Sequence, residues 1–373
     1  MDCNRGGSVQ RESFVEHLLC SSSNVSPMED SKTDIADRAG QLRQLALTDP
    51  ERVDLDELGM ILSSPTQTPK THGAAIVALM NVARTQDDVA ARFVDDIIRL
   101  VNRPSLKTKV ALGCLRQLAA NDPDAVFEHL DEVTSNVSSD DPDIVQAATG
   151  CCVELVDTDP AAFTDMVPML AALLDSKQQT TRINVVYVLS QIASEYPEEV
   201  KPVVPQLVNG ITSEDKSYQI NALSALGSIV SSYPNAAVDA TNDIADTIST
   251  SESTTVQANA AGVLGDVGDQ HPDAIVDHVP VLMTSLESDD EYLAGNAAAA
   301  IVTLVTEEPD AVVDSIPALV EHLDHPSPVL RRNVCKALGH LEATIAIPKL
   351  SSMADSDPDN GVREIASWAV EQV

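Results

Sequence analysis

The sequence is short of aromatic side chains and of positive charge. Aromatic residues make up only 3% of the 373 residues, and Trp368 is the single tryptophan. Lysine and arginine total 23 against 58 aspartates and glutamates, which gives a formal net charge of −35. No lysine or arginine stands between Lys216 and Arg331, a span that holds 18 acidic residues. Because such a surface repels phosphate backbones, we expect no direct binding of nucleic acid.

Cysteine is scarce and forms no CxxC pair. The six cysteines are Cys3, Cys20, Cys114, Cys151, Cys152 and Cys335. The sequence also lacks a secretory h-region and any run of 18 apolar residues. We therefore expect a soluble, cytoplasmic protein with reduced, buried thiols and no membrane partner.

What the sequence does have is a repeat of about 37 residues. A proline preceded by an acidic or aromatic residue recurs at intervals of 36 to 38 residues, with Asp87 in its place once. The positions are Pro50, Asp87, Pro123, Pro160, Pro197, Pro234, Pro272 and Pro309. Such a period predicts a solenoid in which each unit contacts its neighbours. Proline suits these positions because the first turn of a helix needs no N–H donor.

Each unit is expected to contain two helices. In Pro309–His340, an amphipathic helix is predicted from about Asp310 to Leu323 and a second one from about Val329 to His340. A further proline lies eight residues after the first in four units and is expected to bend the first helix. These prolines are Pro168, Pro205, Pro280 and Pro317.

The two-helix unit, its prolines and an arginine at the start of the second helix resemble HEAT-repeat proteins. These arginines are Arg182, Arg331 and Arg363, whereas Gln219, Gln257 and Ala294 stand there in the middle units. The last unit, with Ala346–Leu350 and Asp357–Arg363, is similar to the HEAT-like repeats first named for phycobilisome lyases. The resemblance covers roughly residues 33–373. It implies an all-α fold, a right-handed α-solenoid of about nine two-helix repeats whose second helices line the concave side.

We divide the chain into a tail and one elongated domain. Residues 1–32 are rich in Ser, Gly and Asn and are expected to form a disordered tail, in which Met28 is an alternative start to Met1. Residues 33–373 are expected to form the solenoid, capped by Ile35–Leu47 as a second helix without its first. The full units are expected near 50–86, 87–122, 123–159, 160–196, 197–233, 234–271, 272–308, 309–342 and 343–373.

A column of asparagines lies near the start of the second helices. Asn184, Asn221, Asn259, Asn296 and Asn333 recur at intervals of 37 or 38 residues. At about 100° per residue, Asn184 lies on the flank of its helix, about 120° from the core side near Leu189 and Ile192. The amides either form a ladder that holds an extended peptide, as asparagines of armadillo-type solenoids do, or bond the next unit or the turn.

The residues three and seven positions after each asparagine share one exposed face. They are Tyr187 and Gln191, Ser224 and Ser228, Gly262 and Asp266, Ala299 and Thr303, and Lys336 and His340. Most of them are small and polar, so this face offers room for a partner's segment but few aromatic anchors. We take the asparagine column together with Tyr187, Gln191, Lys336 and His340 as the candidate partner-binding residues.

No catalytic, cofactor-binding or metal-binding residue can be assigned. None of the eight histidines is followed by glutamate, unlike the His-Glu dipeptides of di-iron hydroxylases with HEAT-type repeats. His271 and His278 flank a predicted helix start and make a weak candidate for a metal site. The glycines of Gly262–Gly268 fall inside a predicted helix with no strand before it, which does not fit a phosphate-binding loop. Trp368 is expected to cover the open end of the core.

The favoured function is a non-enzymatic scaffold or adaptor that binds protein partners without a cofactor. Its candidate contact areas are the second-helix face and the less acidic stretch Arg84–Arg116. The alternatives are an enzyme or enzyme subunit of the cofactor or chromophore lyase type, and a structural subunit of a chromosome-associated complex. The acidity has two interpretations, adaptation to a salt-rich cytoplasm or attraction of a basic partner.

Overall fold

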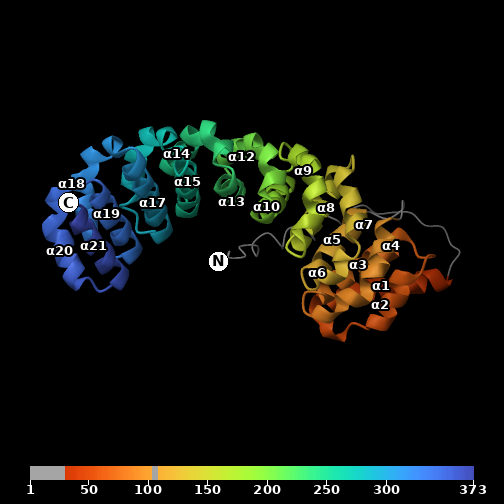
Figure 1. Cartoon of the computed structure of the whole chain (residues 1–373). Coiled ribbons are helices and arrows are strands. Elements are labelled where there is room, and N and C mark those ends of the chain that lie inside the picture. Colours follow the sequence, from red (N-terminus) through yellow and green to blue (C-terminus); the bar gives the residue numbers. More distant parts are fainter. Residues whose placement is uncertain (1–29, 103–107) are drawn as a thin grey trace.

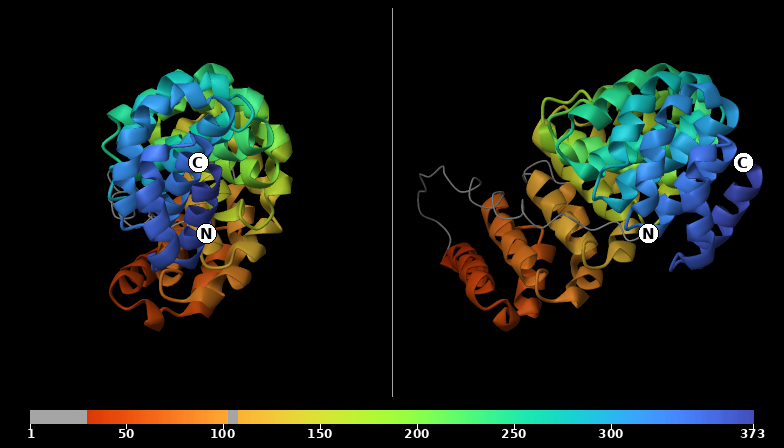
Figure 2. Two further views of the ribbon diagram at one scale, coloured as in Figure 1. Left: turned by 60° about the vertical axis from the view of Figure 1, so that its left-hand side comes forward. Right: turned by 90° about the vertical axis from the view of Figure 1, so that its left-hand side faces the viewer.

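The computed structural model describes residues 30–102 and 108–373, and every regular element in this part of the chain is helical. The helices stack into an open arc (Figure 1). Seen from the side, the chain also leaves the plane of the arc, so that the first and last units diverge (Figure 2). This is an all-α solenoid, as predicted. Most of the segment expected to be a disordered tail, residues 1–29, lies outside the described residues.

One long helix per unit forms the inner layer of the arc. Helices α10, α13, α15 and α17 lie on its inner side, with α9, α12 and α14 outside them (Figure 1). The expectation that the second helices line the concave side is therefore confirmed. The inner helices are α1 (Asp30–Thr48), α3 (Pro69–Val82), α5 (Thr108–Ala119), α8 (Pro142–Leu155), α10 (Gln179–Glu195), α13 (Lys216–Ser232), α15 (Thr254–Gly268), α17 (Glu291–Glu307), α19 (Pro328–His340) and α21 (Asn360–Gln372).

The outer layer consists of shorter helices, many of them joined to 3₁₀ turns. The longer ones are α2 (Leu55–Ser63), α4 (Ala90–Val101), α12 (Val204–Ile211), α14 (Thr241–Thr250) and α20 (Ile347–Ser356). The shorter ones are α6 (Pro123–Phe127), α7 (Leu130–Thr134), α9 (Val167–Leu173), α11 (Pro197–Val200), α16 (Val279–Ser285) and α18 (Ile316–Glu321). The 3₁₀ turns are η2 (Pro50–Arg52), η3 (Asp87–Val89), η4 (Ser135–Ser138), η5 (Pro160–Met166), η6 (Lys201–Val203), η7 (Pro234–Ala240), η8 (Pro272–Ala274), η9 (Val276–His278), η10 (Pro309–Ala311), η11 (Val313–Ser315), η12 (His322–Asp324) and η13 (Thr344–Ala346).

The prediction of one continuous helix from Asp310 to Leu323 is wrong. The chain forms η10, η11, α18 and η12 there instead. Pro317 occupies the first turn of α18, and Pro168, Pro205 and Pro280 do the same in α9, α12 and α16. These prolines therefore do not bend a continuous helix. Each lies where a new helix begins after a 3₁₀ turn, because a proline in the first helical turn leaves no hydrogen bond unmade.

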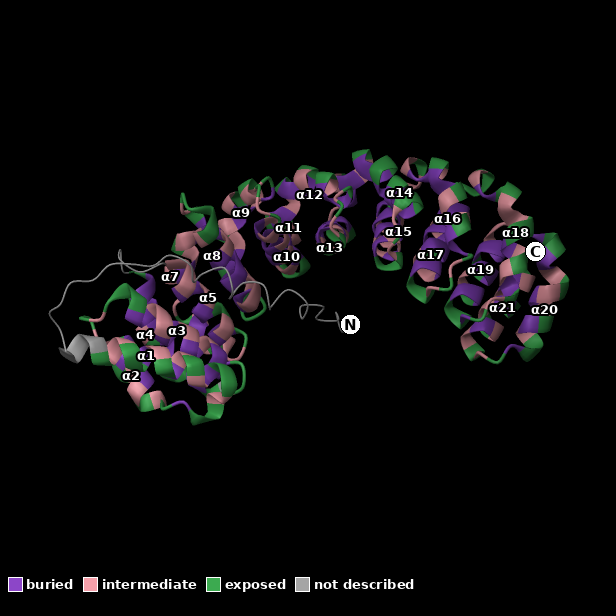
Figure 3. Cartoon of the chain, turned by 180° about the vertical axis from the view of Figure 1, so that it is seen from behind, coloured by how far each residue is buried: buried purple, intermediate pink, exposed green. Residues whose placement is uncertain are grey.

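The core is a continuous apolar layer between the inner and outer helices. A single cluster of buried residues, mostly Val, Leu, Ile and Ala, runs from Ala39 to Ala369, and buried residues follow the whole arc in Figure 3. Neighbouring inner helices approach closely through small residues. A Cβ atom at Gly339 of α19 would lie only 3.0 Å from the Cα atom of Ala369 in α21. Burial of this layer drives the stacking, because a single unit cannot bury its apolar surface by itself and does so only against its neighbours.

Four free cysteines are buried in this core: Cys114, Cys151, Cys152 and Cys335. Burial raises the pKa of the Cys114 and Cys151 thiols, and raises that of Cys152 and of Cys335 to about 12. The thiolate is the reactive form of cysteine, so these side chains are unreactive packing residues.

Candidate partner-binding face on the inner helices

The turn before several inner helices, namely α10, α13, α15, α19 and α21, is held by a repeated pair of contacts. A side chain at the turn accepts the N–H of the residue two positions later; examples are the hydroxyls of Ser139, Ser176, Ser213, Ser251 and Ser288, the Nδ1 of His325 and the carboxylate of Asp357. A residue in the first turn of the helix then donates to carbonyls at the end of the outer segment. Arg182, Gln219, Gln257, Arg331 and Arg363 do this. Gln219 and Gln257 thus keep the contact that arginine makes in other units, whereas Ala294 on α17 has no side-chain donor for it.

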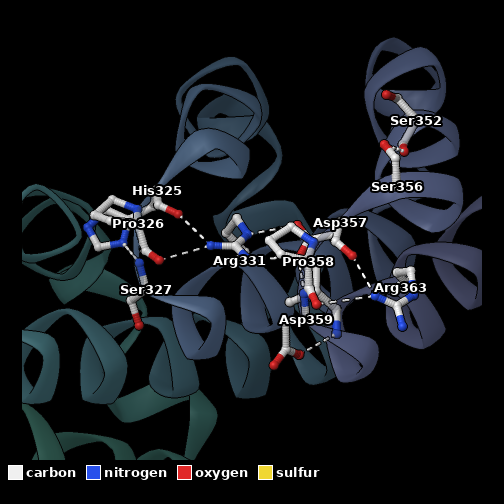
Figure 4. A network of polar contacts seen from close by, with 11 residues as sticks. His325, Pro326, Ser327, Arg331, Ser352, Ser356, Asp357, Pro358, Asp359 and Arg363 are labelled. Carbon is white, nitrogen blue, oxygen red and sulfur yellow. Dashed lines mark hydrogen bonds and ion pairs between the residues drawn. The ribbon is translucent and has the colours of Figure 1, made fainter.

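The last two units add a buried ion pair to this turn. The Arg331 guanidinium donates to both carboxylate oxygens of Asp357, at 2.9 and 2.7 Å, and to the carbonyls of His325 and Pro326 (Figure 4). This hydrogen bonding lowers the pKa of Asp357. The side chains are 10% and 5% exposed, so the pair joins units rather than facing a partner.

Two asparagines of the predicted column bond the preceding unit. The Asn296 amide nitrogen donates to the Ala258 carbonyl at 2.8 Å. The Asn184 amide nitrogen lies 3.2 Å from the Thr149 hydroxyl and 3.5 Å from the Gln146 carbonyl. At these two positions the amides connect neighbouring inner helices.

The other three asparagines are placed differently. Asn221, Asn259 and Asn333 are partly exposed, and their amides make no hydrogen bond with the described residues. They lie on α13, α15 and α19, on the flank of the inner face. The column therefore contains two amides that bond within the solenoid and three whose bonding groups are open.

Of the ten residues expected to form one exposed face, three are exposed and seven are partly buried, and part of this face is used between units. The Tyr187 hydroxyl donates to Asp157 at 3.4 Å, and the Thr303 hydroxyl donates to Asp269 at 2.8 Å. Burial, followed by the nearby charge of Asp269, raises the pKa of Asp266. Ser224 and Ala299 are exposed, and Gln191 is partly exposed. The middle of the inner face is therefore shallow and acidic, with small side chains.

The last inner helices carry larger side chains on the same face. Lys336 of α19 is exposed and forms no ion pair with a described residue. The His340 ring lies 5.0 Å from the ring of Trp368 in α21, and both rings are partly buried. Burial, and to a smaller extent Lys336, lowers the pKa of His340. Trp368 packs against Gly339 of α19, the inner helix of the preceding unit, whereas we had expected it to cover the open end of the core.

The less acidic stretch Arg84–Arg116 uses most of its described cations within the chain. Ion pairs join Arg92 to Asp56 at 2.5 Å, Lys109 to Asp143 at 2.5 Å, Arg116 to Glu154 at 3.2 Å, and Arg99 to Asp96. These contacts neutralise the positive charge of this stretch. Residues 103–107 lie outside the described part.

The remaining sequence candidates do not come together as a site. His278 is buried and burial lowers its pKa, while His271 lies at the start of η8. No group of histidines, cysteines and carboxylates in the described residues is arranged to hold a metal ion. A polar pocket of about 330 Å³ lies beside the α12–α13 turn, with Glu214, Asp243 and Asp246 in its lining. Among helices of the described segments, none has the length and apolar content that crossing a membrane requires.

Stacked helix pairs with a concave inner layer define an α-solenoid of the HEAT and armadillo type. The chain belongs to the family described as the adaptin N-terminal region, which matches residues 66–281, and the HEAT-repeat family matches residues 279–371. A comparison with curated proteins gives no match.

The comparison with solved structures gives engineered and designed proteins. A crystal structure of an engineered protein from the Northeast Structural Genomics Consortium aligns with a TM-score of 0.79 at 22% identity, over 92% of this chain and 96% of the other. A second engineered protein of that consortium (28% identity, 55% of this chain and 95% of the other) and a designed armadillo repeat protein (21%, 55% and 99%) each align with a TM-score of 0.49. The first likeness shows the fold.

Two exposed apolar side chains on this face were not predicted from the sequence. Tyr292, at the start of α17, is 78% exposed, and Val329, at the start of α19, is 45% exposed. Both occupy the repeat position that Thr255 holds on α15. Aligning the units residue by residue reveals them as large apolar side chains in a column of small polar ones.

Proposed function

We propose that the chain is a non-enzymatic scaffold that binds segments of partner proteins along the inner helices. The observation that supports this most directly is the set of open amides on Asn221, Asn259 and Asn333. Asn221 and Asn259 lie one unit apart, and Asn333 lies two units further along the same concave surface. Their amides offer donors and acceptors that a partner's backbone can pair with. Small neighbouring residues such as Ser224 and Gly262 leave room for that backbone.

The finer features of the proposal follow from charge and composition. The partner is a protein, since a surface with a net charge of −35 repels nucleic acid and anionic membranes. We propose a cytoplasmic protein adapted to high salt, with a tail before the solenoid, whose first helix is α1 (Asp30–Thr48). The likeness of the last unit to repeats of phycobilisome lyases does not identify an activity, because one fold serves many functions.

The test is partner capture from a native extract at native salt, followed by mass spectrometry. The triple variant Asn221→Ala, Asn259→Ala, Asn333→Ala is expected to bind the captured partner at least about tenfold more weakly, since each lost hydrogen bond costs about 0.5–1.5 kcal/mol. Its thermal stability should change little, because these amides hold nothing within the solenoid.

The matched control removes three exposed amides from the outer segments, by Asn209→Ala, Asn235→Ala and Asn242→Ala. It should bind like the unmodified chain. Equal binding by both triple variants would refute the role of the inner amides. A stoichiometric metal or a bound chromophore in the purified protein would instead support an enzyme of the lyase type.

A further inference from the structure

The inner face is not uniform along the arc. On α17, α19 and α21, residues at equivalent repeat positions form a grid that differs from the middle units. Its first row holds Tyr292, Val329 and Gly361, its second Gly295, Arg332 and Glu364, and its third Ala299, Lys336 and Trp368. The corresponding first and third rows on α13 and α15 hold Ser217 and Thr255, and Ser224 and Gly262. These positions therefore carry larger side chains on α17, α19 and α21 than on α13 and α15.

The apolar part of this grid is exposed to an unusual degree. Tyr292 is 78% exposed, the largest exposure among the exposed large apolar side chains of the described residues. Val329 is 45% exposed, and its side chain lies 4.0 Å from where a Cβ atom of Gly295 would be. Gly295 has no side chain, so it covers neither of these two exposed apolar side chains.

The two cations of the grid form no ion pair with the described residues. Arg332 and Lys336 lie one turn apart on α19 and both are exposed. Neither forms an ion pair with a described residue, whereas Arg331 beside them is buried against Asp357 and Lys349 pairs with Asp324. In a chain with 58 acidic residues, two adjacent free cations on a concave face are the exception.

A rigid aromatic pair borders the cations. The Trp368 ring packs against Gly339, where a Cβ atom would lie 2.7 Å from it, and is tilted against the His340 ring at 5.0 Å. Both rings are partly exposed beside Lys336. Tryptophan, tyrosine and arginine are the residues that most often dominate the binding energy of protein interfaces.

We infer that the inner faces of α17, α19 and α21 dock an acidic, partly apolar segment of a partner protein. An apolar side chain of the segment packs on Tyr292 and Val329, and its carboxylates pair with Arg332 and Lys336. The acidic middle of the inner face repels such a segment, whereas the adjacent Arg332 and Lys336 attract it. This inference rests on the proposed scaffold function and specifies the partner's chemistry at one end of the same face.

The test is selection of random 12-residue peptides displayed on phage against the full chain, followed by fluorescence anisotropy with the enriched peptides. Enriched peptides are expected to combine Asp or Glu with a large apolar residue. The variant Arg332→Glu, Lys336→Glu should weaken their binding at least tenfold, and Tyr292→Ser should weaken it severalfold.

The matched control is Lys177→Glu, Lys216→Glu, which makes the same change in net charge at two other exposed lysines that form no ion pair with described residues. It should bind the peptides as the unmodified chain does. All variants are compared at a salt concentration at which their circular dichroism is unchanged.

Three results would overturn the inference. They are enrichment of basic peptides, equal binding by the Arg332→Glu, Lys336→Glu variant, and equal affinity for a single-stranded DNA oligonucleotide, which would show unspecific attraction of anions. Peptides that depend on Asn221, Asn259 and Asn333 but not on Arg332 and Lys336 would overturn it and leave the proposed function intact. If the selection enriches no peptide and the extract yields no partner, both the inference and the proposed function are overturned.

Discussion

Two adjacent arginines on α19 show how the same residue type serves different purposes. The Arg331 side chain is 10% exposed, and two nitrogens of its guanidinium, Nε and Nη2, donate to the two carboxylate oxygens of Asp357. Arg332, one position later, is exposed and free of ion pairs with described residues. One joins the last two units, and the other is available to a partner. The difference follows from 100° of rotation about the helix axis per residue.

Replacing Arg331 with methionine is expected to lower the free energy of unfolding by about 3–5 kcal/mol at pH 7, because it leaves the Asp357 carboxylate buried and unpaired. Hydrogen exchange of α19–α21 measures the loss locally, which suits a solenoid whose units can open separately. The control, Arg332→Met, should change the free energy of opening measured by hydrogen exchange by less than about 1 kcal/mol. Similar protection in both variants would contradict the assignment.

The same pair predicts a pH dependence. Arg331 holds the pKa of Asp357 below its usual range, so the pair contributes fully above the pKa of an unfolded aspartate. That contribution is lost as the pH falls through the lowered, folded-state pKa. Protection of α19–α21 in the unmodified chain should therefore decrease below about pH 4. In Arg331→Met the decrease should be smaller, because the cause of the lowered pKa is gone.

At the scale of elements, the prolines decide where the outer helices begin. Pro280 lies in the first turn of α16, after η9, at a place where an N–H group has no partner within the helix. The outer layer is therefore built from short pieces, while the inner helices have 19 residues in α1 and 17 in α10, α13 and α17. Short outer pieces allow each unit to turn back sharply at the unit boundary.

Pro280→Ala is expected to change the free energy of unfolding by less than about 1 kcal/mol, mainly because it changes the conformational entropy of the unfolded chain. Moving the proline one turn along, by Thr284→Pro at an exposed position of α16, should cost about 3 kcal/mol or more, because it removes a helical hydrogen bond and collides with the preceding turn. Thermal unfolding measures both. A large loss of stability in Pro280→Ala would mean that the proline stabilises the folded unit directly.

At the scale of the whole molecule, the distribution of charge separates the ends of the arc from its middle. The described ion pairs involve residues up to Glu154 and from Asp324 onward. Between Lys216 and Arg331, 18 acidic residues face no lysine or arginine within the span. Like charges there repel each other, and only solvent ions reduce that repulsion.

The whole solenoid should therefore be more stable at high salt. Between low salt and about 1 M KCl the screening length falls from about 30 Å to about 3 Å, so the melting temperature is expected to rise markedly. Circular dichroism at both salt concentrations measures it. A variant that carries lysine at exposed Asp269, Glu287 and Asp310 should depend less on salt. Equal melting temperatures at both concentrations would reject salt adaptation.

Several elements were predictable from the sequence because their signals are local and repeated. The helix predicted over Val329–His340 is α19, and the capping helix predicted over Ile35–Leu47 lies within α1. Periodic apolar residues and unit-start prolines suffice for such predictions. The break of Asp310–Leu323 was not predicted, because the pattern of apolar residues is the same for a 3₁₀ turn followed by a helix as for one helix.

The sequence by itself determined the class of fold, the number of layers and the excess of acid, since each is set by a pattern that recurs every 37 residues or so. Only the tertiary structure decided the role of each side chain on the inner face. Asn296 bonds Ala258 while Asn333 stays open, and Arg331 is buried while Arg332 is free. Equivalent repeat positions look alike in sequence, and they differ because each meets a different neighbouring unit.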